Sequence, residues 1–175
     1  MKEKAQANTA LALSTLSFVV CFAVWMMNGV LVTFLVDNKV FTLDKAQIGW
    51  LMGLPVFTGS LIRLPVGIAT DRYGGRVVFT IVMLVSAIGT FGMSLANSYV
   101  GLALGSLAFG LAGTSFSVGI AYSSVWFKKE HQGTALGIFG AGNAGSAVTS
   151  LAGPLILKKL TDGGASLEGW RMFPR

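Results

Sequence analysis

The chain has 175 residues, of which 53% are hydrophobic and only 11% are charged. Soluble domains carry roughly 25% charged residues, so this composition, with a mean hydropathy of +0.70, excludes a soluble domain. The net charge of +6 does not indicate a nucleic-acid partner, because the basic residues stand singly or in pairs between apolar runs. Such residues are typical anchors at the edges of membrane spans, and we expect a lipid bilayer as partner and no nucleic acid.

Five apolar segments are long enough to cross a bilayer, whose hydrocarbon core needs about 20 residues of helix. They are predicted to be helices, because an open strand would leave backbone groups unpaired in lipid. A membrane β-barrel would show alternating segments of about ten residues instead of continuous apolar runs. The fold class is therefore all-α integral membrane. The predicted spans are residues 11–36, 47–70, 77–96, 99–127 and 133–157.

The orientation of these spans does not follow from the positive-inside rule. If the N-terminus is inside, the connectors and termini place six basic residues on the inner side and six on the outer side. The thirteenth basic residue, Arg63, lies within the second span. After the fifth span the chain becomes polar, and its last residues, GWRMFPR, resemble the approach to a sixth span.

Arg63 is a positive charge in the middle of the stretch PVFTGSLIRLPVGIAT. An arginine at the centre of a bilayer costs about 2.5–3.5 kcal/mol on insertion scales, so it usually has a partner. Asp71 at the span end is eight residues away, about 12 Å along a helix, which is far for a side chain to snorkel. The open possibilities are a carboxylate from other sequence, backbone carbonyls or an anionic ligand.

The chemistry of Arg63 favours a small planar anion. A guanidinium is a planar fork that gives two parallel hydrogen bonds to a planar oxyanion. Asn143, in the fifth span, adds an amide donor from another helix. Proton coupling has less support, because proton relays use acidic or histidine side chains within spans and the single histidine, His131, lies in a connector.

Four glycines surround Asn143 in the stretch GIFGAGNAGSAVTS. Glycine weakens a helix by about 1 kcal/mol per site, but small residues let helices approach closely in a membrane, where little hydrophobic force drives association. We therefore predict that Gly137, Gly140, Gly142 and Gly145 pack helices together. The residues expected to share one helical face are Gly133, Gly137, Ala141 and Gly145.

The connector after the second span, GIATDRYGGR, resembles the loop motif of the major facilitator superfamily, G-x-x-x-D-R-x-G-R-[RK]. One position departs from the motif, since Gly75 replaces a basic residue. Three further features are similar to the nitrate/nitrite porter family: FAVWMMNGV in the first span, Arg63 in the second, and GTALGIFGAGNAG in the fifth. The motif residues are Gly67, Asp71, Arg72, Gly74 and Arg76.

This resemblance implies the N-terminal half of a larger bundle, because the family normally has twelve spans in two six-helix halves with the substrate site between them. Residues 1–175 would then be a partial transporter domain. By position, Arg63 matches the arginine that binds the substrate anion, Asn143 the signature asparagine near the substrate, and Phe116 a phenylalanine against the flat anion. Ordinary packing is the alternative role of Phe116. A second substrate arginine and an aromatic partner would come from the other half.

The resemblance also implies a gating role and an orientation. Asp71, Arg72 and Arg76 match the loop motif whose charge pairs hold one conformation in the family. The motif loop and the connector KKEHQG are then expected to be cytoplasmic, with the N-terminus inside, in the cell (inner) membrane. The implied partners are the nitrate or nitrite anion and a C-terminal six-helix half from further sequence or another chain.

Three hypotheses of function remain open. The first is nitrate/nitrite transport by alternating access around a site at the middle of the membrane. The second is a facilitator for another small, organic anion, and the third is a truncated membrane protein that does not transport. We expect no enzyme, metal or cofactor, because the sequence shows no nucleophile–base pair, metal-ligand cluster or phosphate-binding loop.

Overall fold

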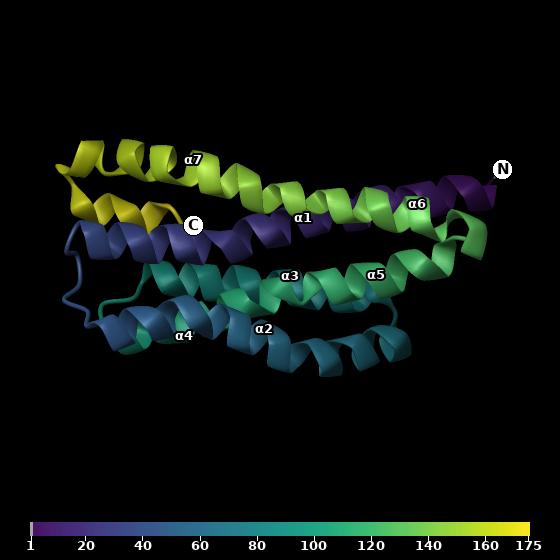
Figure 1. Ribbon diagram of the computed structural model, residues 1–175, viewed down its shortest axis with the longest axis horizontal. Coiled ribbons are helices and arrows are strands. Elements are labelled where there is room, and N and C mark those ends of the chain that lie inside the picture. Colours follow the sequence, from purple (N-terminus) through teal and green to yellow (C-terminus); the bar gives the residue numbers. More distant parts are fainter. Residues whose placement is uncertain (1) are drawn as a thin grey trace.

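The computed structural model describes residues 2–175, with side-chain burial from residue 4 onward. Every regular element in this range is a helix, and the long helices lie side by side in an elongated bundle (Figure 1). The predicted all-α membrane fold is therefore confirmed. The elements are α1 (Lys2–Asp37), α2 (Lys45–Tyr73), α3 (Gly75–Ser94), α4 (Tyr99–Gly113), α5 (Ser115–Trp126), α6 (Lys129–Gly140), η1 (Ala141–Asn143), α7 (Ala144–Leu160), η2 (Asp162–Gly164) and η3 (Leu167–Met172).

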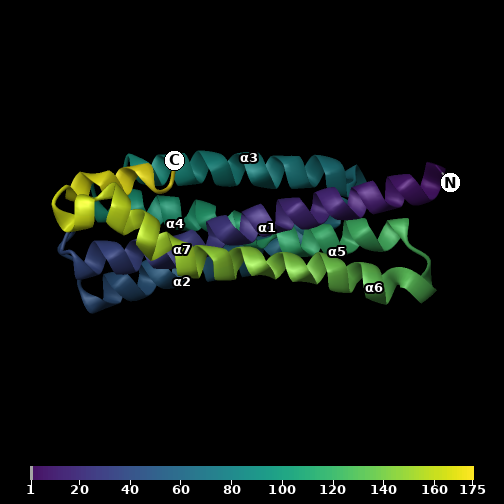
Figure 2. The same cartoon turned by 90° about the horizontal axis from the view of Figure 1, so that it is seen from above.

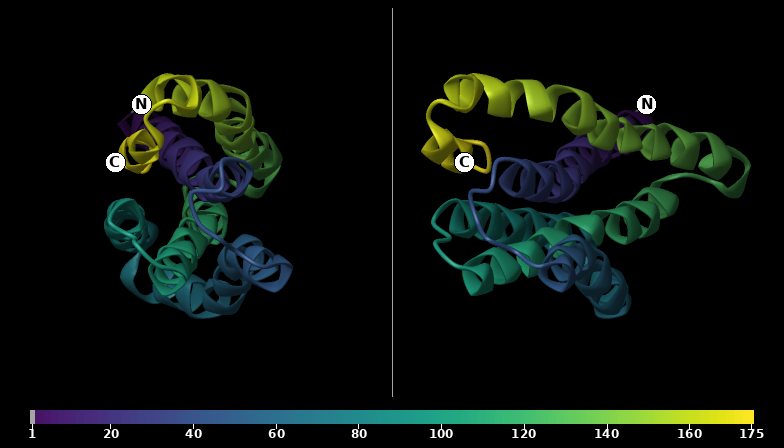
Figure 3. Two further views of the ribbon diagram at one scale, coloured as in Figure 1. Left: turned by 90° about the vertical axis from the view of Figure 1, so that its left-hand side faces the viewer. Right: turned by 60° about the vertical axis from the view of Figure 1, so that its left-hand side comes forward.

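The bundle has two ends, which the connectors define. We call the end with residues 38–44, 95–98 and 161–175 the tail end, and the end with residue 74 and residues 127–128 the motif end. Helix α1 contacts every other long helix. The end-on view in Figure 3 shows α1 between α7, which lies above it, and α2, which lies below it. The helix that begins the chain is thus the centre of the bundle.

Four helical stretches within residues 2–175 are long and apolar enough to cross a membrane, and they correspond to the first four predicted spans. They are Lys4–Asp37, Lys45–Tyr73, Gly75–Ser94 and Tyr99–Trp126. The segment predicted as a fifth span, residues 133–157, is helical but interrupted. It is divided among α6, η1 and α7, which follow one another along one side of the bundle (Figures 1 and 2).

The sequence did not predict the break between α4 and α5 at Thr114. The hydroxyls of Thr114 and Ser115 donate to the carbonyls of Leu111 and Ala112, at 2.7 and 2.6 Å. Hydroxyl side chains that bond back to carbonyls one turn earlier compete with the helical ladder and bend helices. Two such residues in succession explain why the fourth span is two helices.

The second break, at η1, coincides with the glycine-rich stretch. Gly140 and Gly142 favour helix weakly, and two glycines of the stretch lie directly against α1. A Cβ at position 142 would meet the ring of Phe18 and the carbonyl of Thr15, and one at position 145 would meet the backbone of Val19. The glycine-rich segment therefore packs closely against α1 at the point where a 3-10 turn separates α6 from α7.

The core consists of one apolar cluster towards each end of the bundle. The cluster near the tail end includes Leu31, Leu35, Phe109 and Trp170, and the other, nearer the motif end, includes Phe18, Phe79 and Phe139. The outer helix faces carry large exposed apolar residues, as expected for a surface in contact with lipid. Together with the four spans, this establishes a multi-pass membrane protein.

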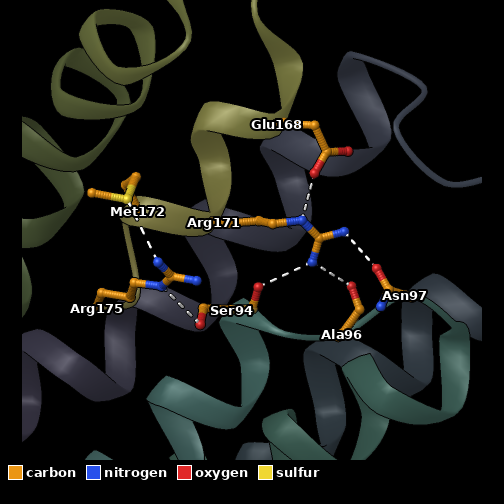
Figure 4. A network of polar contacts seen from close by, with 7 residues as sticks. All are labelled: Ser94, Ala96, Asn97, Glu168, Arg171, Met172 and Arg175. Atoms are coloured by element: carbon orange, nitrogen blue, oxygen red, sulfur yellow. Dashed lines mark hydrogen bonds and ion pairs between the residues drawn. The ribbon is translucent and has the colours of Figure 1, made fainter.

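The residues after α7 fold back onto the tail end (Figure 4). Arg171 donates to the carbonyls of Ser94 and Ala96, at 3.0 and 2.7 Å, and to the side-chain oxygen of Asn97 at 2.8 Å. These carbonyls belong to the last turn of α3 and the residues after it, which lack partners within the helix. Trp170 next to it is fully buried, so η3 ties α7 to the end of α3.

Candidate functional site

Arg63 lies in α2, and its side chain is exposed. It has no hydrogen bond or ion pair to another side chain among residues 4–175. The buried face of α2 carries Leu51, Pro55, Thr58 and Gly59. Arg63 follows Gly59 by one turn, so it lies at the edge of this face rather than opposite to it.

The lipid-facing side of α2 is a different stripe. Phe57, Leu61, Leu64 and Ile68 recur every three or four residues and are 60–73% exposed. This spacing places them on one face of the helix, away from the buried face. Arg63 does not belong to this stripe.

Arg63 shares its side of α2 with Met52 and Val56, from which it is spaced by eleven and seven residues. Met52 and Val56 line a cavity of about 140 Å³ between α2 and α1, together with Met26 and Gly29 of α1. Met26 and Gly29 also line a second cavity of about 520 Å³, between α1 and α7 at the tail end. One face of α1 is thus open between α2 and α7. Arg63 lines neither cavity, but it lies on the same side of α2 as the two residues that line the smaller one.

Phe116 lies at the same level of the bundle as Arg63. Helices α2 and α4 both run from the tail end to the motif end and touch where a Cβ on Gly59 would lie 2.9 Å from the carbonyl oxygen of Gly110. Arg63 follows Gly59 by four residues and Phe116 follows Gly110 by six. At 1.5 Å per residue, the two residues differ by about 3 Å along the bundle.

The side chain of Phe116 belongs to a group of aromatic rings at this level. Its ring centroid lies 5.6 Å from that of Phe18 and 6.2 Å from that of Phe139, while Phe18 and Phe22 are 4.3 Å apart. Phe116 is 37% exposed, whereas Phe18 and Phe139 are buried. It is therefore anchored by one side against other rings and open on the other side.

Asn143 is the last residue of η1, and its side chain is exposed. Its neighbour Gly142 lies against Phe18, the ring that also packs on Phe116. Gly145, two residues after Asn143, lies against Val19. Asn143 therefore lies at the same height along the bundle axis as residues 18–19 of α1. Because the ring of Phe18 also packs on Phe116, this is about the height of Phe116 and Arg63 as well. The three residues occupy one level but come from three different helices.

The glycines expected to pack helices have two different surroundings. Gly142 and Gly145 approach α1, as described above, whereas nothing lies within 4 Å of a Cβ built on Gly137 or Gly140. Gly133 and Ala141, which were expected on the same face as Gly137, are exposed as well. The face that contacts α1 carries Gly142, Gly145 and Gly153. A packing role of Gly137 and Gly140 remains a prediction.

The predicted loop DRYGGR is almost entirely helical, which corrects its description as a connector. Helix α2 continues to Tyr73 and α3 begins at Gly75, so Gly74 alone joins them. Gly74 has φ +83°, a conformation that residues with a Cβ rarely adopt. Gly75, the position that departs from the motif, is buried, and a Cβ there would overlap the side chain of Tyr122.

The charged motif residues Asp71, Arg72 and Arg76 are all exposed at the motif end. Among residues 4–175 none of them forms an ion pair, although the guanidinium of Arg72 lies 5.4 Å from the ring centroid of Tyr73. Gly67, the first motif residue, has open space where a Cβ would lie. A charge pair that holds one conformation therefore remains a prediction that needs a partner beyond these residues.

Sequence reasoning missed several residues that form the walls of this region. Phe18, Phe22 and Trp25 recur on α1 at spacings of four and three residues, and adjacent rings lie 4.3 and 5.4 Å apart. That spacing indicates a shared helical face and was visible in the sequence. Asn28 is a buried amide that joins three helices, and its partners are too distant in sequence for a local pattern to indicate them.

Comparison with known proteins agrees with the fold and the motif. The family model described as "Major Facilitator Superfamily" matches residues 13–173. This chain belongs to the major facilitator superfamily. Members of that superfamily are generally membrane transporters and not enzymes, and the helical bundle described above is part of the corresponding fold.

The chain is also similar to three curated members of this kind. It is 45% identical to a "Probable nitrate/nitrite antiporter NarK1" of Thermus thermophilus, over 99% of this chain and 40% of the relative. It is 34% identical to a "Nitrite extrusion protein" of Bacillus subtilis (strain 168), over 92% and 38%. It is 33% identical to a "Probable nitrate transporter NarT" of Staphylococcus aureus (strain JH9), over 98% and 42%. The chain thus spans about two fifths of the length of these curated relatives.

Proposed function

We propose that this chain is part of a nitrate/nitrite transporter, and that Arg63 binds the transported anion. The observation that carries the proposal is the position of Arg63 in a membrane-spanning helix, on the side of α2 that also carries the cavity residues Met52 and Val56, with no counter-ion among residues 4–175. An unpaired cation in a span is costly, and a bound anion would offset that cost. The names of the similar proteins support nitrate or nitrite as that anion.

In this proposal the three residues at one level have different tasks. The guanidinium of Arg63 donates two parallel hydrogen bonds to two oxygens of the planar anion. Asn143 donates through its side-chain amide, and the exposed side of Phe116 forms an apolar wall that limits the site to small, flat anions. No group here is suited to cleave or form a bond, so the chemistry is binding and release during alternating access.

The remaining parts of the site would come from outside residues 1–175. The chain spans 38–42% of its relatives, which supports a longer transporter with a second helical half. The open surroundings of Gly137 and Gly140 suit close contact with helices of that half. We place the protein in the inner membrane with the motif end and the N-terminus in the cytoplasm.

Uptake of labelled nitrate by the complete transporter that contains residues 1–175 tests the role of Arg63. Arg63→Lys keeps the charge but loses the fork, and we expect it to abolish most uptake. Arg175→Lys makes the same exchange at the tail end, away from the candidate site, and should retain uptake. Unchanged uptake in Arg63→Lys contradicts the site assignment.

Two further measurements separate the other hypotheses. Competition by nitrate, nitrite and short carboxylates against labelled nitrate identifies the anion class, and stronger competition by carboxylates favours an organic-anion facilitator. Reconstitution of residues 1–175 alone tests whether half a bundle transports. We expect no saturable flux from it, and robust flux contradicts the need for a second half.

A further inference from the structure

Asn28 is a buried amide at the junction of three helices. It lies in α1 with 2% of its surface exposed. Its side-chain nitrogen donates to the carbonyl oxygen of Leu51 in α2 at 3.0 Å, and its side-chain oxygen accepts from the hydroxyl of Ser106 in α4 at 2.9 Å. The NH2 group and the oxygen of the amide therefore each form a hydrogen bond, and each bond is to a different neighbouring helix.

The carbonyl that Asn28 binds is one that α2 itself cannot satisfy. In an α-helix the carbonyl of Leu51 accepts from the backbone N–H four residues later, and that residue is Pro55, which has no N–H. Leu51 is fully buried, so water is not available to the free carbonyl. The amide of Asn28 takes the place of the missing backbone donor.

Proline inside a helix also bends it, and α2, which contains Pro55 and Pro65, is visibly bent in Figure 1. On one side of Pro55, Gly110 of α4 lies close to the carbonyl of Pro55. On the other side, Pro55 borders the cavity of about 140 Å³ between α1 and α2, which Asn28 also lines. The bend thus has backbone contact on one side and unfilled space on the other, so packing alone does not fix its angle.

The angle of this bend decides where Arg63 lies. Arg63 follows Pro55 by eight residues, about 12 Å along the helix. A small change of angle at Pro55 therefore moves Arg63 relative to Phe116 and Asn143, which α5 and η1 carry. The side of α2 that Arg63 occupies is the side that borders the cavity.

We propose that Asn28 is a positioning residue, whose hydrogen bond to Leu51 fixes the bend of α2 at Pro55 and thereby the place of Arg63. Its importance for transport rests on the function proposed above. Its effect on the shape of α2 does not, and that effect is measurable without any anion. Ser106 holds the amide of Asn28 in the orientation that makes this bond.

The test is a distance measurement between spin labels on the 175-residue chain, in a background in which Cys21, its single cysteine, is replaced. Cysteines replace Leu64 of α2 and Leu151 of α7, which are 73% and 77% exposed. Ile88 of α3, which is 72% exposed, paired with Leu151 gives a reference distance that does not involve α2. Asn28→Leu removes both hydrogen bonds and keeps the branched shape and the number of heavy atoms of the side chain.

We expect Asn28→Leu to shift or widen the Leu64–Leu151 distance and leave the Ile88–Leu151 distance unchanged. Pro55→Ala restores the backbone donor and should shift the first distance by straightening α2. In the Pro55→Ala background, Asn28→Leu should then add no further shift. Ser106→Ala, which keeps the Leu51 bond, should have a smaller effect than Asn28→Leu.

An unchanged Leu64–Leu151 distance in folded Asn28→Leu overturns the proposal and leaves the role of Arg63 untouched. If Asn28→Leu does not fold, the double variant with Pro55→Ala decides, because it again satisfies the Leu51 carbonyl. Folding of the double variant supports the proposal, and its failure to fold overturns it. In the complete transporter, Asn28→Leu should raise the KM for the anion more than it lowers the maximal rate, which reduced stability alone does not do.

Discussion

The ring of Phe18 lies against Gly142, in the turn that interrupts the helix carrying Asn143. The same ring lies 5.6 Å from that of Phe116. One side chain of the central helix therefore contacts Phe116 and the residue before Asn143, and Phe116 and Asn143 are two of the three proposed ligand-binding residues. Because its neighbour at position 142 is a glycine, the contact brings the interrupted helix onto α1.

A side chain at position 142 is expected to push this helix away from α1. Gly142→Val should destabilise the protein by about 1–3 kcal/mol, the usual cost of overpacking, because a Cβ there meets Phe18 and the carbonyl of Thr15. Gly140→Val is the matched control, since a Cβ there meets nothing within 4 Å. Unfolding of the purified variants of residues 1–175 in detergent measures the difference, and equal destabilisation argues against the contact.

The contact between Gly59 and Gly110 sets the level of Arg63 relative to Phe116. Gly59→Ala should separate α2 from α4, because its Cβ would lie 2.9 Å from the backbone oxygen of Gly110, and we expect a loss of about 1–3 kcal/mol. Gly53→Ala in the same helix has open space and should stabilise by up to about 1 kcal/mol. A Gly59→Ala protein as stable as the Gly53→Ala protein contradicts the close crossing.

Restoring the basic residue of the loop motif is expected to harm this chain. Gly75→Arg should destabilise the motif end, because any side chain at this buried position overlaps Tyr122. Tyr122→Gly removes the Cβ and the ring atoms that overlap, so the double variant should lose less stability than the sum of the single variants, as for residues in contact. Additive losses in thermal unfolding experiments count against this account of the departure.

The two partners of the ion pair at the tail end are expected to differ in importance. Arg171→Gln removes donors from the carbonyls of Ser94 and Ala96 and should cost about 1–3 kcal/mol, as for hydrogen bonds from a charged donor. Glu168→Gln removes only an exposed ion pair and should cost at most about 1 kcal/mol. Hydrogen exchange of residues 94–97 reports on the same region, and similar effects of both variants would contradict this assignment.

The wall formed by Phe116 is expected to contribute to anion affinity rather than to folding. Phe116→Ala in the complete transporter should raise the KM for nitrate up to about tenfold, since an aromatic contact contributes up to about 1.5 kcal/mol. Phe57→Ala, on the lipid-facing stripe of α2, is the control and should leave the KM unchanged. If both variants behave alike, Phe116 is an ordinary packing residue.

The sequence predicts the helical class and the position of the first four spans to within a few residues, except at the N-terminus, where α1 begins at Lys2 rather than near residue 11. This agreement arises because apolar length is a local property of the chain. The breaks at Thr114 and Ala141–Asn143 escaped prediction, since they depend on hydroxyl–carbonyl bonds and on contacts with α1. Neither the hydroxyl–carbonyl bonds nor the contacts with α1 can be inferred from apolar length and hydropathy.

The site residues show a similar division. Arg63 is conspicuous in the sequence because a charge in a span is costly. The sequence does not indicate the height of Arg63 along the bundle relative to Phe116, because the contact between Gly59 and Gly110 of two different helices sets it. Asn28 escaped notice for the same reason, since its partners Leu51 and Ser106 are distant in sequence.

The joint at Gly74 has a mechanical consequence. Since a single residue separates the end of α2 from the start of α3, the linker is too short to let the two helix ends move apart. A tilt or axial shift of α2 that displaces Arg63 must pull the first turn of α3 with it, where Gly75 is wedged against Tyr122 of α5. The end of α2, the first turn of α3 and the contact with Tyr122 would then move together.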